Sequence, residues 1–207
     1  LFSFVLLGGK CRYCQKPISI HYPLVELATG IVTLLIFNFQ FSHFAEIPQS
    51  GFFNLFISYA LIAIFVSDLL YFTIPDEIVY SAIGATILFH LRGVPAGYLA
   101  GVLGSGLAAA AFFLALVLIT KGRGMGMGDV KLAGLMGLVL GWPKILIALY
   151  LAFLTGALVG VTLILLKKKQ FGEHIPFGPF LATATIISLF WGEIIWEKAM
   201  VLLSLNF

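Results

Sequence analysis

Two aspartates stand at the borders of apolar segments, where their carboxylates could act as an acid–base pair. Asp129 ends the glycine-rich run that begins at Gly124, and Asp68 lies near the end of an apolar stretch, about 52–70. A charge beside lipid is costly unless it faces protein or water, so each aspartate is a candidate functional residue. Two carboxylates brought together share a proton: the ionised one can activate a water, and the protonated one can assist a carbonyl and a leaving nitrogen. This chemistry hydrolyses a peptide bond without a nucleophilic side chain or a metal.

Both aspartates also have a structural interpretation, as helix caps or as partners of a lysine. Asp129 could bind the free N–H groups of a helix that starts at Val130. Asp68 lies inside an apolar span and fits that role less well, so the placement of the two acids favours a functional pair. Asp76 follows Pro75 and is expected to cap the helix that comes next.

Asp76, Lys131 and Glu26 are secondary candidates. Lys131 closely follows Asp129 and could tune its charge, although a loop lysine on the cytoplasmic side is the interpretation that we favour. Glu26 lies a short way into the first apolar stretch, where an acid is costly. It could pair with a basic residue of another helix, or line the route of a substrate or cofactor.

The segments that must position these side chains are long and apolar. The chain has 207 residues, of which 61% are hydrophobic and 10% are charged, whereas a soluble domain has about 25% charged residues. Its apolar runs are continuous, as in membrane-spanning helices, rather than alternating, as in a barrel. We therefore predict an all-α fold, a polytopic transmembrane bundle of about six to eight helices. The expected helical segments are about 23–39, 52–70, 77–91, 96–120, 130–140, 145–166 and 180–206.

The distribution of lysine and arginine predicts the orientation of these segments. Nine of the twelve basic residues fall on one side and at most three on the other, and the richer side is expected to be cytoplasmic. Alternating the spans places Asp68, Asp76 and Asp129 on that side, together with Lys167–Lys169, which we expect to contact lipid headgroups. No basic face extends beyond short loop clusters, so nucleic acid is not an expected partner.

Residues 8–22 form a polar and basic segment that contains both cysteines. Cys11 and Cys14 are three positions apart, a spacing typical of half a metal site or of a thiol pair. Residues 1–7 resemble the end of an apolar segment, and no basic region precedes them. We therefore interpret the chain as N-terminally shortened.

The acids belong to a series of five short motifs. Gly126-Met-Gly-Asp129 is followed by Val130-Lys131, and Asp68 stands eight residues before Asp76 in Ile74-Pro-Asp76. The other three motifs are Cys11-Arg-Tyr-Cys14 with Pro17-Ile-Ser19, Tyr22-Pro-Leu-Val-Glu26, and Ile175-Pro-Phe-Gly-Pro179. This ordered set resembles the type IV prepilin peptidase family, whose GxGD motif matches Gly126–Asp129. The resemblance covers about residues 8–182, most of the chain.

The resemblance implies an integral membrane aspartic endopeptidase with Asp68 and Asp129 as its catalytic pair, and with Gly126 and Gly128 in a substrate loop. Such an enzyme removes the basic leader peptide of type IV prepilins or pseudopilins, after a glycine, at the cytoplasmic face of the bacterial inner membrane. It needs no cofactor for this step. The family also methylates the new N-terminus with S-adenosylmethionine. No glycine-rich strand-to-helix turn for such a cofactor is visible, so methylation rests on the resemblance alone.

The chain departs from the family at its cysteines. Long-form members have two Cys-x-x-Cys pairs, and a structural Zn²⁺ takes four ligands. Cys11 and Cys14 make only half of such a site, so zinc is expected if a longer natural chain supplies the missing pair, and two free thiols otherwise. On this basis we divide the chain into a cytoplasmic segment, 1–22, and a transmembrane aspartic peptidase domain, 23–207.

Two other functions also fit a pair of acids in a membrane bundle. The first is an intramembrane aspartyl protease of the presenilin type, but Ser67 stands where that group has tyrosine, and Pro176-Phe-Gly-Pro179 where it has Pro-Ala-Leu. The second is a proton- or cation-coupled transporter. Internal repeats are common in transporters, but none is visible here, and the acids lie at one border rather than at mid-span.

Overall fold

The structure is a computed structural model that describes residues 2–40, 48–92, 95–122, 124–167 and 175–204. The helices in these residues are α1 (Phe2–Leu6), α2 (His21–Gln40), α3 (Pro48–Tyr71), α4 (Asp76–Leu91), α5 (Ala96–Thr120), α6 (Met127–Leu140), α7 (Lys144–Leu165) and α8 (Gly178–Ser204). The same residues contain no strand, only an isolated bridge between Lys10 and Pro17. The predicted all-α fold of about six to eight helices is confirmed.

Five of the described helices are long and apolar enough to cross a membrane, as expected for a multi-pass membrane protein. These stretches are His21–Asn38, Gly51–Tyr71, Gly97–Thr120, Lys144–Leu165 and Gly178–Leu202. The helices α4 and α6 have 16 and 14 residues, so at about 1.5 Å per residue each is shorter than a hydrocarbon core of about 30 Å. The predicted span at 77–91 is therefore a helix, but one too short to cross the membrane unaided.

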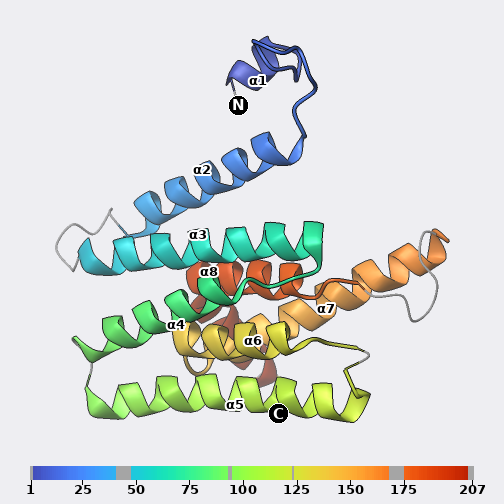
Figure 1. Cartoon of the computed structure of the whole chain (residues 1–207). Helices are drawn as coiled ribbons and strands as arrows, with labels where there is room; N and C mark the ends of the chain where they lie inside the picture. The colour runs from blue at the N-terminus through green and yellow to red at the C-terminus, as the bar shows by residue number, and fades with distance from the viewer. Residues whose placement is uncertain (1, 41–47, 93–94, 123, 168–174, 205–207) are drawn as a thin grey trace. The chain divides into compact units, whose positions relative to one another are not determined.

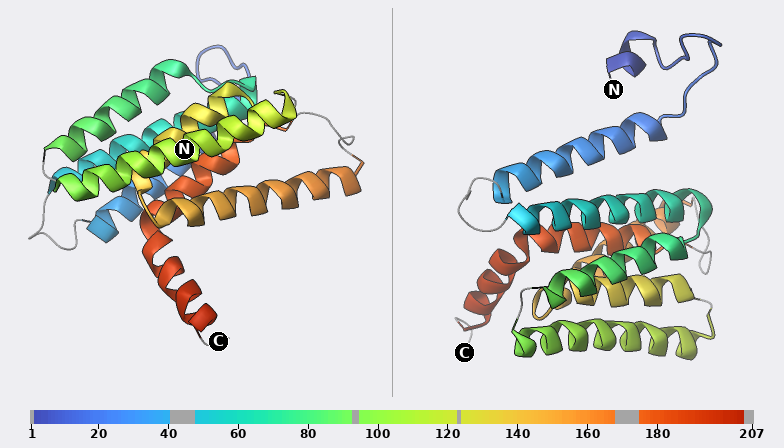
Figure 2. Two further views of the ribbon diagram at one scale, coloured as in Figure 1. Left: turned by 90° about the horizontal axis from the view of Figure 1, so that it is seen from below. Right: turned by 60° about the vertical axis from the view of Figure 1, so that its left-hand side comes forward.

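The chain forms two compact units, Leu1–Ile62 and Ala63–Phe207. In the second unit α6 is the central helix: it packs against α4, α5, α7 and α8, and Figures 1 and 2 show it between α4 and α5. Leu132, Ala133 and Met136 of α6 have no exposed surface. Apolar helices of this length are typically buried in a protein core, where other helices rather than lipid surround them.

The helices α5 and α6 approach each other at glycines. A Cβ atom on Gly137 would lie 2.5 Å from the carbonyl oxygen of Ser105 and 2.6 Å from Cα of Gly106. A Cβ atom on Gly106 would lie 2.7 Å from Cγ of Leu138. Small residues allow such close contact between helix backbones. This crossing therefore fixes the axial position of α6 relative to α5, and with it the position of Asp129.

Successive helices of the second unit run in opposite directions, so helix ends that are distant in sequence meet in space. Figure 1 shows the carboxyl ends of α3 and α5 and the amino ends of α4, α6 and α8 on one side of this unit. We call this side the carboxylate end, because Asp68, Asp76 and Asp129 lie on it. On the opposite side, Lys144 and Glu193 form an ion pair of 2.6 Å.

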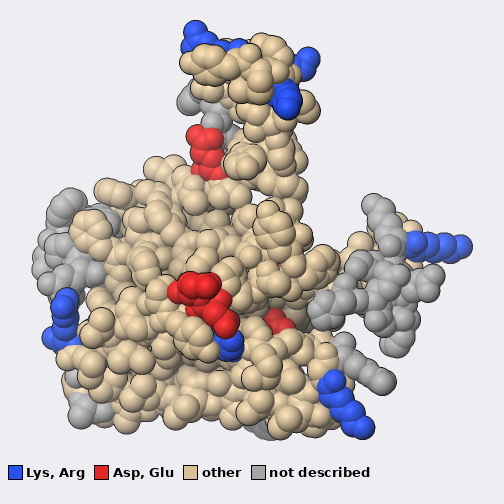
Figure 3. Space-filling view, viewed as in Figure 1, with Lys and Arg blue, Asp and Glu red and all other residues tan. Residues whose placement is uncertain are grey.

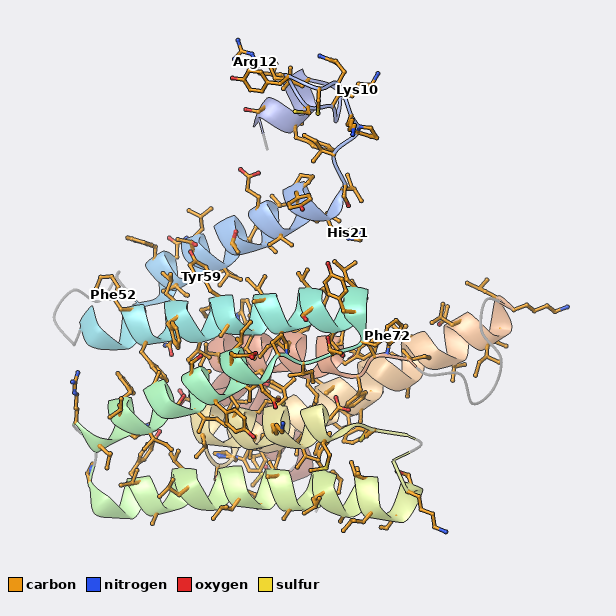
Figure 4. All side chains as sticks on the ribbon, viewed as in Figure 1. Lys10, Arg12, His21, Phe52, Tyr59 and Phe72 are labelled. Atoms are coloured by element: carbon orange, nitrogen blue, oxygen red, sulfur yellow. The ribbon has the colours of Figure 1, made fainter. Side chains whose placement is uncertain are left out.

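The first unit contains the cysteine segment, α2 and the first part of α3. The hydroxyls of Thr33 and Tyr59 are hydrogen-bonded at 2.6 Å and link α2 to α3. In the segment before α2, the N–H of Cys11 donates to the carbonyl of Lys16 at 2.9 Å, which closes a tight loop. Figure 4 shows Lys10 and Arg12 directed outward from this loop.

Candidate active site

Asp68 lies in the last turn of α3, where α8 begins. Its side chain is almost fully buried, with 6% of the residue exposed. The N–H of Gly178, the first residue of α8, donates to Oδ2 of Asp68 at 2.9 Å. A Cβ atom on Gly178 would lie 2.6 Å from that same oxygen, so a larger residue could not keep this contact. The hydrogen bond to the Asp68 carboxylate therefore requires a glycine at position 178.

Asp129 is the third residue of α6 and is 7% exposed. Its Oδ2 accepts a hydrogen bond from the N–H of Gly126 at 2.9 Å, which is the carboxylate half of a capping box. The sequence predicts a helix that starts at Val130, whereas α6 starts at Met127. Asp129 thus does cap the helix, but from inside its first turn, reaching back to Gly126.

Both aspartates line one cavity of about 250 Å³. Among the predicted site residues, Asp76, Gly126 and Gly128 line it as well. The remaining lining residues are Phe72, Thr73, Ile74, Gly124, Ile175, Pro176 and Phe177. Three segments that lie far apart in the sequence therefore form one small pocket with two buried carboxylates in its wall.

Asp76, which lines this pocket, forms an ion pair with Lys131, which does not. Lys131 Nζ donates to both carboxylate oxygens of Asp76, each at 2.7 Å, and lies 5.4 Å from the ring centroid of Tyr80. The hydrogen bond from Lys131 to Asp76 raises the pKa of Lys131 above its ordinary value, so its ammonium stays protonated. Figure 3 shows acidic side chains and a basic one together on this face of the second unit, surrounded by uncharged surface.

Two sequence-based interpretations of these residues are wrong. Asp76 is the first residue of α4 and makes no capping bond, because the cap position is held by Pro75. Lys131 is part of α6 rather than of a loop. The two residues are 55 positions apart, and no local spacing rule predicts that they pair.

The link between α3 and α4 contacts both helix ends that touch the aspartates. A Cβ atom on Gly128 would lie 3.1 Å from Cβ of Ile74, and one on Gly178 would lie 3.2 Å from Cδ1 of the same isoleucine. The Ser67 hydroxyl donates to the carbonyl of Thr73 at 2.9 Å, which folds the link back on α3. Figure 4 marks Phe72 at this turn. Ile74 and Gly178 were not among the predicted site residues, although both belong to motifs quoted for the family resemblance.

An aromatic cluster holds Phe177, the residue directly before α8. The ring of Phe177 lies 5.2 Å from that of Phe153 on α7 and 6.2 Å from that of Phe113 on α5, between ring centroids. A Cβ atom on Gly156 would lie 3.0 Å from the Phe177 ring, so α7 also presents a glycine to it. Since Gly178 follows directly, this packing also holds the N–H that binds Asp68.

The cysteine segment supplies two thiols. Hydrogen bonds from the backbone of Cys14, and then from that of Tyr13, lower the pKa of Cys11 below its ordinary value and favour its thiolate. A closed zinc site takes four ligands, and across the described parts of the chain no three His, Cys, Asp or Glu residues gather in a group that could hold a metal. The residues that the structure describes therefore fit half of a zinc site.

Glu26, the third secondary candidate, belongs to the first unit. It lies on α2 beside a shallow, mainly apolar hollow lined by Leu27, Gly30 and Leu34 of the same helix. The backbone carbonyl of Glu26 accepts a hydrogen bond from Thr29 at 3.0 Å. The pocket that contains Asp68 and Asp129 is lined by residues of the second unit.

Comparison with known proteins agrees with the motifs. The type IV leader peptidase family matches residues 55–161, and the bacterial peptidase A24 N-terminal domain matches residues 1–40. No solved structure matches the chain at a significant level.

Three similar proteins each carry the name prepilin leader peptidase/N-methyltransferase. The protein of Aeromonas salmonicida is 35% identical over 207 residues, which cover 98% of this chain and 69% of that protein. The Aeromonas hydrophila protein is 36% identical over 199 residues, and the Pseudomonas aeruginosa protein 34% over 196; each match covers 93% of this chain and 66% of the relative. These matches favour neither a presenilin-type protease nor a transporter. The chain belongs to the type IV leader peptidase family.

Proposed function

We propose that this protein is a membrane aspartic endopeptidase that removes the leader peptide from type IV prepilins or pseudopilins, and that Asp68 and Asp129 perform the hydrolysis. The observation that carries the assignment of residues is that both buried carboxylates line one pocket. Family membership and the names of the relatives support the reaction class.

In the proposed mechanism the two aspartates share one proton. The ionised carboxylate accepts a proton from a water molecule while the water oxygen attacks the scissile carbonyl carbon. The protonated carboxyl donates its proton to the carbonyl oxygen, which gives a gem-diol. As the C–N bond breaks, the first carboxyl protonates the departing amine and the second carboxylate takes a proton back from a diol hydroxyl, which restores the starting state. One oxygen of each aspartate is held by a backbone N–H, from Gly178 or from Gly126. These bonds orient the acids before substrate arrives, so little reorganisation is needed during the reaction.

The pocket is proposed to open toward the cytoplasm of a bacterium, at the inner membrane. In the sequence, the segment between α5 and α6 contains Lys121 and Arg123, and the segment between α7 and α8 contains Lys167–Lys169. Lysine and arginine are enriched in cytoplasmic loops. A prepilin leader that stays in the cytoplasm would then reach the pocket without crossing the membrane.

N-methylation of the new N-terminus with S-adenosylmethionine is proposed from the names of the relatives. The described residues hold no strand, and so no strand-to-helix turn of the kind that binds nucleotide-like cofactors. Likewise, zinc in the 1–22 segment would need two ligands besides Cys11 and Cys14.

Mass spectrometry of a prepilin incubated with the protein tests this function. The purified protein in liposomes is mixed with a purified type IV prepilin, with and without S-adenosylmethionine. We expect loss of the leader in both reactions, and gain of one methylene mass only with the cofactor. An uncut prepilin would contradict the peptidase assignment, and a cut but unmethylated one would contradict only the methylation.

A further inference from the structure

The Asp76–Lys131 ion pair joins the two chain segments that carry the proposed catalytic acids. Lys131 lies two residues after Asp129 on α6, and Asp76 lies at the end of the link that follows Asp68. Both carboxylate oxygens of Asp76 accept from the same ammonium at 2.7 Å. A displacement of α6 relative to the link would have to lengthen these bonds.

Two other contacts hold the lysine and the helix end in the same place. Tyr80 lies one turn after Asp76 on α4, and its ring lies beneath Lys131 Nζ. The backbone of α6 at Gly128 rests directly on Ile74 of the link. The ion pair and the glycine contact lie on either side of Asp129 in the sequence, so together they fix the turn that carries this acid.

We propose that the Asp76–Lys131 pair positions Asp129 relative to Asp68, and thereby sets the turnover rate without contacting the reacting atoms. Partly exposed ion pairs contribute little to global stability, and both side chains are partly exposed, 27% for Lys131 and 54% for Asp76. Effects on the geometry of the site can nevertheless be large, because a misplacement of about 1 Å can cost about a hundredfold in rate. This inference rests on the proposed function for its kinetic part.

The opposite side of the second unit offers a matched control pair. Lys144 and Glu193 form an ion pair of 2.6 Å, and the lysine is likewise 27% exposed. Lys144 is the first residue of α7, and neither partner lines the aspartate pocket. Loss of this pair removes the same kind of interaction at a site distant from the chemistry.

Steady-state kinetics on a double-mutant cycle tests the proposal. Cleavage of a purified type IV prepilin is assayed with four variants: Lys131→Met, Asp76→Asn, the double variant, and the charge exchange Asp76→Lys with Lys131→Asp. The controls are Lys144→Met and Glu193→Gln. We expect kcat to fall about tenfold in each single variant with KM unchanged, no further loss in the double variant, and partial recovery on charge exchange. A rise in KM with kcat unchanged would overturn the proposal, because Asp76 would then contact the substrate. Unchanged kinetics would overturn it too.

Hydrogen–deuterium exchange provides a readout that does not depend on cleavage. The amides of residues 124–131 should exchange faster in Lys131→Met than in the wild type, and at the wild-type rate in Lys144→Met. An unchanged rate in Lys131→Met would refute the positioning role. If the exchange responds as expected while the wild type leaves every prepilin uncut, the proposed function fails and the positioning role stands.

Discussion

At the carboxylate end of the second unit three aspartates line one pocket, whereas at its other side Glu193 pairs with Lys144 near two tryptophans that pack edge to face. Asp68 and Asp129 are nearly buried and receive hydrogen bonds from backbone N–H groups. Glu193 is 75% exposed and pairs with a lysine. An exposed acid with a cationic partner is an ordinary surface feature. Two acids buried together within a membrane protein are costly, and that cost points to function.

The largest predicted effect is on the buried acids. Asp68→Asn and Asp129→Asn should each reduce leader cleavage by more than about a thousandfold, and the double variant should be no worse than either single one, because the acids act as a unit. Cleavage is followed by mass spectrometry of the prepilin, with helix content measured by circular dichroism to verify the fold. Near-normal cleavage by either single variant would show that this aspartate is not catalytic, and that the buried acids do not differ in function from the exposed Glu193.

The second effect is on the N–H donor of Asp68. Gly178→Ala would place a methyl group 2.6 Å from Oδ2 of Asp68, so we expect kcat to fall about tenfold to a hundredfold. Gly160→Ala is the matched control, since its nearest neighbour, Cδ1 of Ile175, would be 3.8 Å away. Equal activity of the two variants would show that the Gly178 contact does not orient the acid.

A third effect is on stability rather than on chemistry. Gly137→Ala would force a methyl group against the backbone of α5, and we expect a loss of about 1–3 kcal/mol in the free energy of unfolding. Gly101→Ala, with nothing within 4 Å of the added atom, should not lose stability. Thermal unfolding in detergent distinguishes the two. Equal unfolding temperatures would mean that the α5–α6 crossing can accommodate a methyl group at position 137, contrary to the structure.

The smallest effect is expected at the exposed pair. Lys144→Met and Glu193→Gln should leave kcat/KM within about twofold of the wild type, because surface ion pairs contribute little. The assay is the same prepilin cleavage. A large loss of kcat/KM in either variant would mean that this side of the unit also takes part in the reaction, like the carboxylate end.

The sequence predicted the helices better than it predicted the contacts between them. Long apolar runs located α3, α5 and α7 to within a few residues, because hydrophobic length alone defines such segments. The placement of Asp68 with Asp129 followed from charge counting and motif order, and both line one pocket. The bond from Gly178 to Asp68 joins residues 110 positions apart. Such a contact depends on how the helices pack, which local pattern cannot reveal.

The pH dependence of kcat/KM for prepilin cleavage shows whether Asp68 and Asp129 share a proton. Two coupled carboxyls titrate with two separated apparent pKa values that belong to the pair. A shared proton predicts a bell-shaped profile, since activity needs one ionised and one protonated acid. The profile should persist in Glu193→Gln. A single limb, or activity that continues unchanged to high pH where both acids are ionised, would contradict the shared proton.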